Sequence, residues 1–229
     1  MSALSCLWRI VKSYKRGVSE AVFTQRLSLS TSDVRTSRKT NFDELGLFYG
    51  GLSGKCKDDF EKGTKQYVTY MNVFKNPLAN QQANEYVSVN STEKQNRVSY
   101  GDILFTQSSE TLEEVGYSSV WLYHDRPYLN SFCFGFHFYN LSEINPIYFA
   151  YYMRSGSMRK AIMREGQGAT RINLSAERMK CIELILPSTL EQNAIADFLF
   201  ALDKRIQSES RIMDLLIQAK GGYMQKMFI

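Results

Sequence analysis

Residues 187–229, which have the sequence PSTLEQNAIADFLFALDKRIQSESRIMDLLIQAKGGYMQKMFI, decide the fold. Ser188 and Glu191 stand three residues apart, which is the spacing of a helix capping box. In such a box the Ser hydroxyl accepts a hydrogen bond from the third backbone amide, and the Glu side chain reaches back to the cap. Pro187 favours an extended conformation just before it. The sequence therefore predicts a helix that begins directly after Ser188.

Apolar side chains recur along this helix with the alternating four- and three-residue spacing of a heptad repeat. The apolar seam consists of Ile195, Leu199, Leu202, Ile206, Met213, Leu216, Tyr223 and Met227. The polar residues Glu209 and Lys220 interrupt the seam and are expected to fix its register. A helix of about 39 residues is about 60 Å long. This pattern predicts a coiled-coil arm that pairs with another helix; a solvated helix lying on its own domain is the alternative.

The composition is that of a globular protein with one sizeable domain and an appendage. The 229 residues are 44% hydrophobic and 22% charged, and no apolar run approaches the roughly eighteen residues that span a membrane. The four cysteines are scattered, which is typical of reduced thiols in a cytoplasmic protein. His124 and His137 have no ligand partners at metal spacing, so no metal site is expected.

The net charge of +5 is unevenly distributed along the chain. Residues 1–40 hold eight Lys/Arg against two Asp/Glu, so overall basicity does not demonstrate nucleic-acid binding. A second basic stretch, residues 147–182, contains Arg154, Arg159, Lys160, Arg164, Arg171, Arg178 and Lys180. This stretch indicates either a local basic face or an ordinary solvated helix surface, and charge alone leaves both open.

Between the two ends, the patterns predict an α+β domain. An amphipathic helix is predicted over residues 3–27 and a Ser/Thr/Arg-rich linker over residues 28–41. β-branched and aromatic runs predict strands at residues 45–49, 66–71, 86–89, 98–106, 120–123, 132–139 and 181–186. A helix with proline in its first turn is predicted at residues 146–153. The predicted fold is a mixed-sheet domain followed by a long C-terminal coiled-coil helix.

The end of the first predicted helix resembles the end of the last. Lys, Gly and Phe coincide when residues 15–23 are aligned with residues 220–228. Identities at equivalent helix ends indicate one repeat unit that runs from the close of one long helix to the close of the next.

The motifs that could suggest an enzyme lack the spacing or the accompanying residues that the chemistry needs. The glycine-rich residues 50–55 lack the spacing of a phosphate loop. Residues 145–148, Asn-Pro-Ile-Tyr, resemble the Asn-Pro-Pro-Tyr of amino-methyltransferases, but no glycine-rich S-adenosylmethionine motif accompanies them and a helix start explains them better. Glu113, Glu114 and Asp125 show no metal-ligand pattern. No nucleophile, base and oxyanion site can be assembled, so no catalytic residues are predicted.

Two loops instead have the chemistry of a binding surface. Residues 101–111 end a strand in a polar loop whose Gln and Ser/Thr side chains suit hydrogen bonds to base edges or phosphates. Residues 166–171 place a Gln, a Thr and an Arg among glycines, which allow close approach of the backbone.

These segments together resemble the specificity (S) subunit of type I restriction-modification systems. The resemblance rests on Gly-Asp-Ile-Leu-Phe at 101–105, Gly-Gln-Gly-Ala-Thr-Arg-Ile-Asn-Leu-Ser at 166–175, and Leu-Pro-Ser…Glu-Gln…Ile-Ala…Leu-Asp between residues 186 and 203. It covers roughly residues 42–228. Such subunits usually hold two target-recognition domains, each followed by a long helix, and the two helices pack antiparallel.

The resemblance implies a non-catalytic subunit that recognises one half of a bipartite DNA target. It further implies docking to modification subunits, which carry S-adenosylmethionine and methylate adenine, and to restriction subunits; the chain itself needs no cofactor. Its parts would be a helical segment with linker (1–30), a target-recognition domain (31–187) and a coiled-coil helix (188–229). DNA contacts are predicted from Lys55, Lys57, Gln107, Ser108, Arg164, Gln167, Thr170 and Arg171.

The chain carries one recognition domain and one whole helix, so it resembles a half-length form. We expect two copies, or two different halves, to pair through Ile195–Met227, and a symmetric pair would require a palindromic bipartite target. The alternatives are a coiled-coil interaction protein without DNA contact, an inactive truncated specificity fragment, and a stand-alone methyltransferase.

Overall fold

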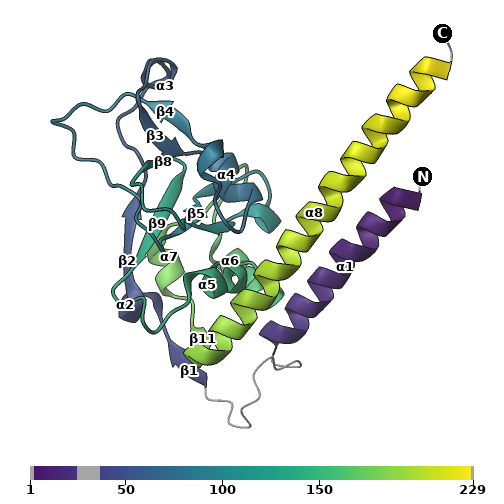
Figure 1. Ribbon diagram of the computed structural model, residues 1–229. Helices are drawn as coiled ribbons and strands as arrows, with labels where there is room; N and C mark the ends of the chain where they lie inside the picture. Colours follow the sequence, from purple (N-terminus) through teal and green to yellow (C-terminus); the bar gives the residue numbers. More distant parts are fainter. Residues whose placement is uncertain (1–2, 25–36, 228–229) are drawn as a thin grey trace. The chain divides into compact units, whose positions relative to one another are not determined.

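The chain divides into two compact units, shown in Figure 1. The computed structural model describes residues 3–24 and 37–227. One unit is Ser30–Asn193, and the other combines Met1–Leu29 with Ala194–Ile229. Residues 28–36 of the predicted linker lie outside the described residues.

The unit Ser30–Asn193 is built on antiparallel and mixed sheets. The four-stranded antiparallel sheet has the order β2 (Gly46–Gly50), β9 (Cys133–Phe138), β5 (Ile103–Thr106), β7 (Ser118–Val120). In the three-stranded sheet, β3 (Lys65–Val68) pairs antiparallel with β4 (Glu85–Val87) and parallel with β8 (Tyr128–Leu129). Two antiparallel pairs complete the described strands: β1 (Ser37–Thr40) with β11 (Leu184–Pro187), and β6 (Ser108–Ser109) with β10 (Ile172–Asn173).

The helices of this unit are short. They are α2 (Phe42–Leu45), α3 (Lys57–Glu61), α4 (Tyr70–Lys75), α5 (Pro146–Met153), α6 (Gly156–Glu165) and α7 (Ala176–Lys180), with the 3-10 turns η1 (Gln81–Ala83) and η2 (Leu112–Glu114). The helix predicted at residues 146–153 is confirmed. The Asn145 side chain accepts from the amides of Ile147 (2.9 Å) and Tyr148 (3.0 Å), so the Asn-Pro-Ile-Tyr motif is a helix start.

Some predicted boundaries differ from the structure. The strand predicted over residues 66–71 ends at Val68, because the Thr69 hydroxyl accepts from the Asn72 amide (3.2 Å) and caps α4. Residues 37–40, predicted as linker, form β1 instead. The partner of β1 is β11 at the far end of the unit's sequence, so no local pattern indicates this strand.

Phenylalanine rings bind the four-stranded sheet to its covering helices. Phe42 of α2, Phe136 of β9 and Phe149 of α5 are fully buried. The Phe42 ring centroid lies 5.1 Å from that of Phe136 and 5.9 Å from that of Phe149, both edge to face. Such ring pairs contribute about 0.5–1.5 kcal/mol beyond area burial, so α2 and α5 are fixed on one face of the sheet.

Two arginines of the basic stretch point into the unit and hold its loops. The Arg154 guanidinium donates to the carbonyls of Ser118 (2.6 Å) and Val73 (2.8 Å), among others. Arg159 donates to the Gly116 carbonyl (3.0 Å), and burial lowers its pKa. Both guanidinium groups lie against the Tyr117 ring, at 4.9 and 4.6 Å from its centroid. These cations are structural and do not contribute to an outer basic face.

The Gly-Asp pair at residues 101–102 also has a structural role. Gly101 has a φ of 85°, which favours glycine. The buried Asp102 carboxylate accepts from the Tyr49 hydroxyl (2.6 Å) and the Ser99 amide (2.8 Å), and it lies 2.6 Å from His137 Nδ1. Burial raises the pKa of Asp102, while these hydrogen bonds oppose the rise. The network ties the start of β5 to β2 and β9.

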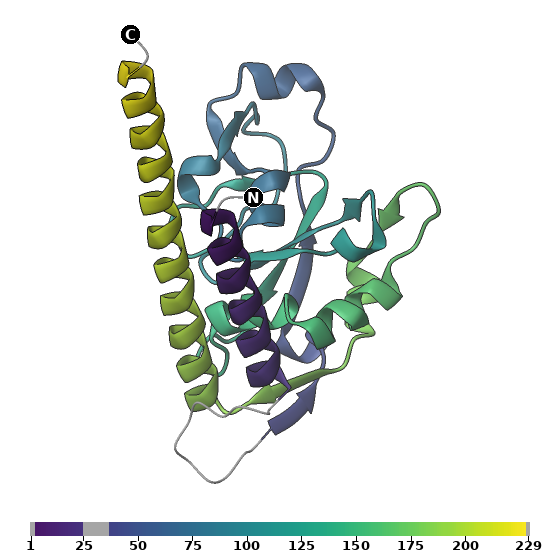
Figure 2. The same ribbon diagram turned by 90° about the vertical axis from the view of Figure 1, so that its right-hand side faces the viewer.

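The other unit contains two long helices. Helix α1 (Ala3–Phe23) and helix α8 (Thr189–Met227), which begins at the end of Ser30–Asn193, run side by side in opposite directions in Figures 1 and 2. An ion pair between Lys15 and Asp203 joins them. At 39 residues α8 is about 60 Å long, and no described helix is apolar enough over a sufficient length to cross a membrane. The long C-terminal helix of the predicted fold class is confirmed.

The start of α8 is capped as predicted. The Ser188 hydroxyl accepts from the Glu191 amide (3.3 Å). Within Ser30–Asn193, Gln192 donates to the Pro187 carbonyl (3.0 Å) and its side-chain oxygen accepts from the Asn145 amide (3.0 Å). The first turn of α8 is therefore anchored to the N-cap of α5.

Burial along the predicted seam changes midway through α8. Ile195 and Leu199 are buried, while Leu202, Ile206 and Met213 are half-buried. Leu216 and Tyr223 are 58% and 71% exposed, and the Met227 side chain lies outside the described residues. Ile212, Leu215 and Ile217 are also at least 50% exposed. The second half of α8 therefore carries a large apolar surface in contact with solvent.

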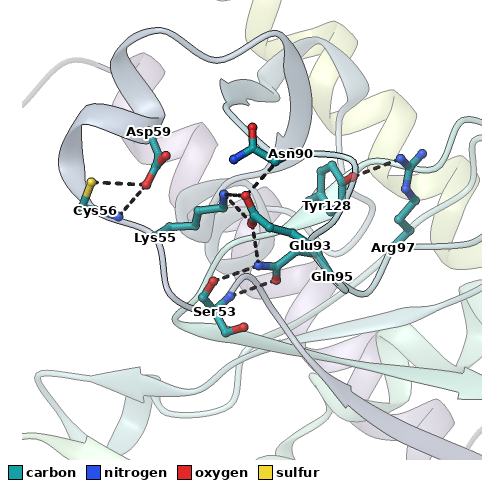
Figure 3. Close-up of polar contacts among 9 residues, drawn as sticks. All are labelled: Ser53, Lys55, Cys56, Asp59, Asn90, Glu93, Gln95, Arg97 and Tyr128. Carbon is teal, nitrogen blue, oxygen red and sulfur yellow. Dashed lines mark hydrogen bonds and ion pairs between the residues drawn. The ribbon is translucent and has the colours of Figure 1, made fainter.

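A salt bridge shapes the loop between β4 and β5, as Figure 3 shows. Lys55 Nζ lies 2.6 Å from a Glu93 carboxylate oxygen, and the Lys55 side chain is only 4% exposed. The Glu93 carboxylate also accepts from the Asn90 amide (3.0 Å) and from Gln95 (3.2 Å), which in turn donates to the Ser53 carbonyl (2.8 Å). These contacts, with Lys55 the largest, lower the pKa of Glu93 to about 2.

We predict that Lys55→Met raises the pKa of Glu93 towards its ordinary value of about 4.3. Because folding depresses this pKa, the stabilisation is present above the unfolded value and is lost as the pH falls towards about 2. Carboxyl ¹³C NMR titration measures the pKa of Glu93 in the wild type and in Lys55→Met. Lys57→Met is the control, because Lys57 is exposed and lies 3.6 Å from Glu61 instead. A wild-type Glu93 that titrates near 4.3 would contradict this assignment.

Candidate nucleic-acid interface

The strand pair β6–β10 joins two segments that lie far apart in the sequence. Ile172 is paired with Ser109 and Asn173 with Ser108. The pairing continues beyond the strands, because the Leu174 amide donates to the Gln107 carbonyl (2.8 Å). The two polar loops predicted to bind DNA are therefore neighbours in the folded chain.

Residues 167–173 form a hairpin beside β6. Gln167 and Asn173 donate to each other's carbonyls at 2.9 and 2.7 Å. Gly168 has a φ of 129°, and a Cβ atom there would lie 2.0 Å from the Arg171 carbonyl oxygen. Only glycine fits this position. The hairpin leaves Thr170 and Arg171 exposed near its tip.

An open hollow of about 440 Å³ lies beside the β6–β10 pair. Tyr70, Met71 and Phe74 of α4 line it together with Phe132, and its polar groups come from Ser108, Ser109, Glu110, Glu114 and Arg171. The Tyr70 hydroxyl is fixed by donating to the Ser108 carbonyl (2.7 Å). This hollow brings Ser108 and Arg171, two of the predicted contacts, to one place.

Gln107 faces a different hollow from Ser108. Successive side chains of an extended segment point to opposite faces. Gln107 accordingly lines a second hollow of about 440 Å³ with Tyr49, Tyr139 and Lys180. The structure therefore brings the backbones of Gln107 and Ser108 to the same strand end but sends their side chains to separate surfaces.

The basic stretch 147–182 is only partly a free basic face. Arg154 and Arg159 point inward, Arg178 lies 3.5 Å from Glu165, and Lys180 lies 3.1 Å from Glu177. The other three cations, Lys160, Arg164 and Arg171, are exposed, and no described residue forms an ion pair with them. Lys160 was not among the predicted contacts, although its four-residue spacing from Arg164 places both on one face of α6.

The remaining predicted contacts, Lys55 and Lys57, lie just before and at the start of α3, far from the β6–β10 pair in the sequence. The Lys55 ammonium already neutralises Glu93 (Figure 3). Lys57 is exposed and lies 3.6 Å from Glu61. Their DNA contacts, like those of the other predicted residues, stay predictions, and the geometry gives Lys55 a structural role.

Another cationic group was missed by the sequence analysis. Lys65, Arg97 and Arg126 line a small hollow of about 170 Å³ with Asp125 and Tyr128. Arg97 donates to the Tyr128 hydroxyl (3.0 Å) and stacks 4.9 Å above its ring. The three cations come from β3 and two separate loops, so no local pattern could indicate the group. Among the described residues, no group of His, Cys, Asp and Glu side chains is arranged to hold a metal ion.

The fold is similar to solved S subunits. The S subunit of a type I system from M. genitalium has a TM-score of 0.54 and 15% identity over 81% of this chain and 44% of that one. A structure on complex assembly and conformational transition of the type I R-M system has a TM-score of 0.57 and 14% identity over 93% and 52%. The HsdS subunit from Thermoanaerobacter tengcongensis has a TM-score of 0.56 and 11% identity over 91% and 49%.

The chain spans about half the length of these solved chains. A search of curated proteins finds no match. The family model for the type I restriction modification DNA specificity domain matches residues 51–216, from the glycine-rich turn after β2 into the second half of α8. Because this match covers more than half of the sequence, the chain belongs to the family of type I restriction modification DNA specificity domains.

Proposed function

We propose that this chain recognises a DNA sequence for a type I restriction-modification complex. The observation that carries the proposal is the β6–β10 pair, which places Arg171, a cation without an ion pair to any described residue, beside an open hollow in a chain of the DNA specificity family. Membership of that family also confirms the prediction of a non-catalytic component. The chain supplies recognition, and the chemistry belongs to its partners.

Recognition uses two kinds of DNA contact, one to phosphates and one to base edges. Exposed cations that are free of ion pairs, Lys160 and Arg164 on α6, suit DNA phosphates, which fix the protein on the duplex without carrying sequence information. Side chains that line the hollow, such as Ser108 and Arg171, suit base edges in the major groove. Lys65, Arg97 and Arg126 offer a further phosphate contact on the other sheet.

The long helix α8 serves pairing and spacing. The seam residues Ile195 and Leu199 in its first half are buried, while Ile212, Leu215, Leu216, Ile217 and Tyr223 are exposed in the second half. Exposed apolar side chains of this density on one helix segment are typical of an interaction surface. A second copy, or a different specificity half, packs on this segment, and the pair recognises a bipartite target with a gap set by the helices.

Modification and restriction subunits dock on this paired assembly. S-adenosylmethionine is bound by the modification subunit, and the specificity chain needs no cofactor of its own. The alternative is a coiled-coil interaction protein that makes no DNA contact, which the exposed apolar half of α8 would also suit. The salt dependence of DNA binding separates the two, because phosphate contacts release counterions.

Arg171→Ala is expected to weaken binding to duplex DNA by about 1–3 kcal/mol, since a guanidinium that contacts a base is lost. Fluorescence anisotropy with labelled duplexes between about 50 and 200 mM salt measures the affinity. Lys39→Ala is the matched control, because Lys39 is exposed on β1 and paired with Glu183 at 3.0 Å. An unchanged affinity for Arg171→Ala removes this residue from the interface. Binding that is absent, or independent of salt, favours the interaction-protein alternative.

Leu216→Asp is expected to convert a dimer into a monomer, because it places a charge in the exposed apolar segment of α8. Sedimentation velocity at micromolar concentration reports the state. Leu190→Asp is the control, since Leu190 is 66% exposed on the first turn of the same helix and lies off the seam. A wild-type chain that stays strictly monomeric, also with modification subunits added, contradicts the pairing.

A further inference from the structure

The hollow beside β6 holds opposite charges that do not neutralise each other. Arg171 and Glu114 both line it, and neither forms an ion pair with a described residue. Both act on the Tyr70 hydroxyl: burial is the main cause of the raised pKa of Tyr70, Glu114 raises this pKa further, and Arg171 lowers it. The lining of the hollow therefore offers a cationic donor, an anionic acceptor and one fixed hydroxyl.

The apolar wall of the hollow is partly exposed but firmly supported. Met71 and Phe132 are 46% and 56% exposed. In the same lining, the Tyr70 and Phe74 rings stack at 5.9 Å, and Phe74 meets the Tyr117 ring edge to face at 5.1 Å. Tyr117 is in turn covered by Arg154 and Arg159. A supported apolar wall next to unpaired charges suits a ligand that has a polar edge and an apolar edge.

A G·C base pair has these properties in the major groove. Guanine presents two adjacent acceptors, O6 and N7, which match the two-pronged guanidinium of arginine. Cytosine presents its N4 amino group, which a carboxylate accepts, and beside it the apolar C5 position. An A·T pair offers no two adjacent acceptors on one base, because the N6 amino group of adenine separates N7 from the thymine O4. The donor and acceptor of this hollow therefore distinguish the two pairs.

We propose that the hollow recognises one G·C pair of the target. Arg171 donates to O6 and N7 of the guanine, Glu114 accepts from N4 of the cytosine, and Met71 and Phe132 lie against the cytosine C5 position. This inference rests on the proposed function, since it names the base pair that the candidate interface selects. The hairpin 167–173 carries Arg171, and the turn η2 shortly after β6 carries Glu114, so the β6–β10 pairing constrains the spacing between the two groups.

The test is a selection of random-sequence DNA duplexes by the full chain. The wild type is expected to enrich a motif with an invariant G·C pair. Glu114→Gln is expected to relax that position alone, by about 5- to 150-fold in preference, which is the range for one good base contact. Glu113→Gln is the matched control: it makes the same charge change one residue away, at an exposed side chain that does not line the hollow.

Modified bases then test single atoms at the invariant pair. Replacing guanine with 7-deazaguanine removes N7 and is expected to weaken binding by the wild type but not by Arg171→Ala. Methylation of cytosine at C5 is expected to leave binding unchanged or stronger, because the methyl group meets the apolar wall.

The outcomes separate this inference from the proposed function. If the wild type enriches a motif and Glu114→Gln enriches the same one, or if the affected position is an A·T pair, the inference is wrong and DNA recognition stands. If the wild type binds duplexes but enriches no motif, or binds none, the proposed function fails and the inference fails with it.

Discussion

The antiparallel pairing of β6 with β10 is the constraint on which the proposed interface depends. It is only two residues long in each strand, yet it holds the segment after β5 against the hairpin 167–173. Without it, Ser108 and Arg171 would belong to separate loops and no shared hollow would exist. Short ladders of this kind are stable only when the surrounding structure fixes both strands.

The surrounding structure supplies that support through Arg159, a half-buried cation of α6. Arg159 donates to carbonyls of the segment 113–116 and lies against the Tyr117 ring. The Tyr117 amide in turn donates a hydrogen bond to the hydroxyl of Thr106 at the end of β5. Because α6 carries Arg159 on its inner face, the same helix can present Lys160 and Arg164 to solvent. One short basic helix thus stabilises the segment 113–116, which includes the hollow-lining Glu114, and also presents two exposed cations to solvent.

Local sequence patterns predicted individual helices and strands better than they predicted which segments lie next to each other in the fold. The proline-initiated α5 and the Ser188 cap of α8 follow from a few adjacent residues, and both are present. The β6–β10 pair, the β1–β11 pair and the Lys55–Glu93 salt bridge join residues far apart in sequence, which periodicity cannot connect. For the same reason charge counting could not tell inward arginines from outward ones. The fold class was predictable, whereas the shape of the candidate interface required the structure.

Hydrogen–deuterium exchange of the full chain, with and without a pool of mixed-sequence duplexes at low salt, locates the surface that DNA covers. We expect added DNA to slow exchange of the backbone amides in residues 107–111 and 166–173, while those of β1 keep their rates. Slowed exchange confined to other parts of the chain, with residues 107–111 and 166–173 unchanged, would contradict it.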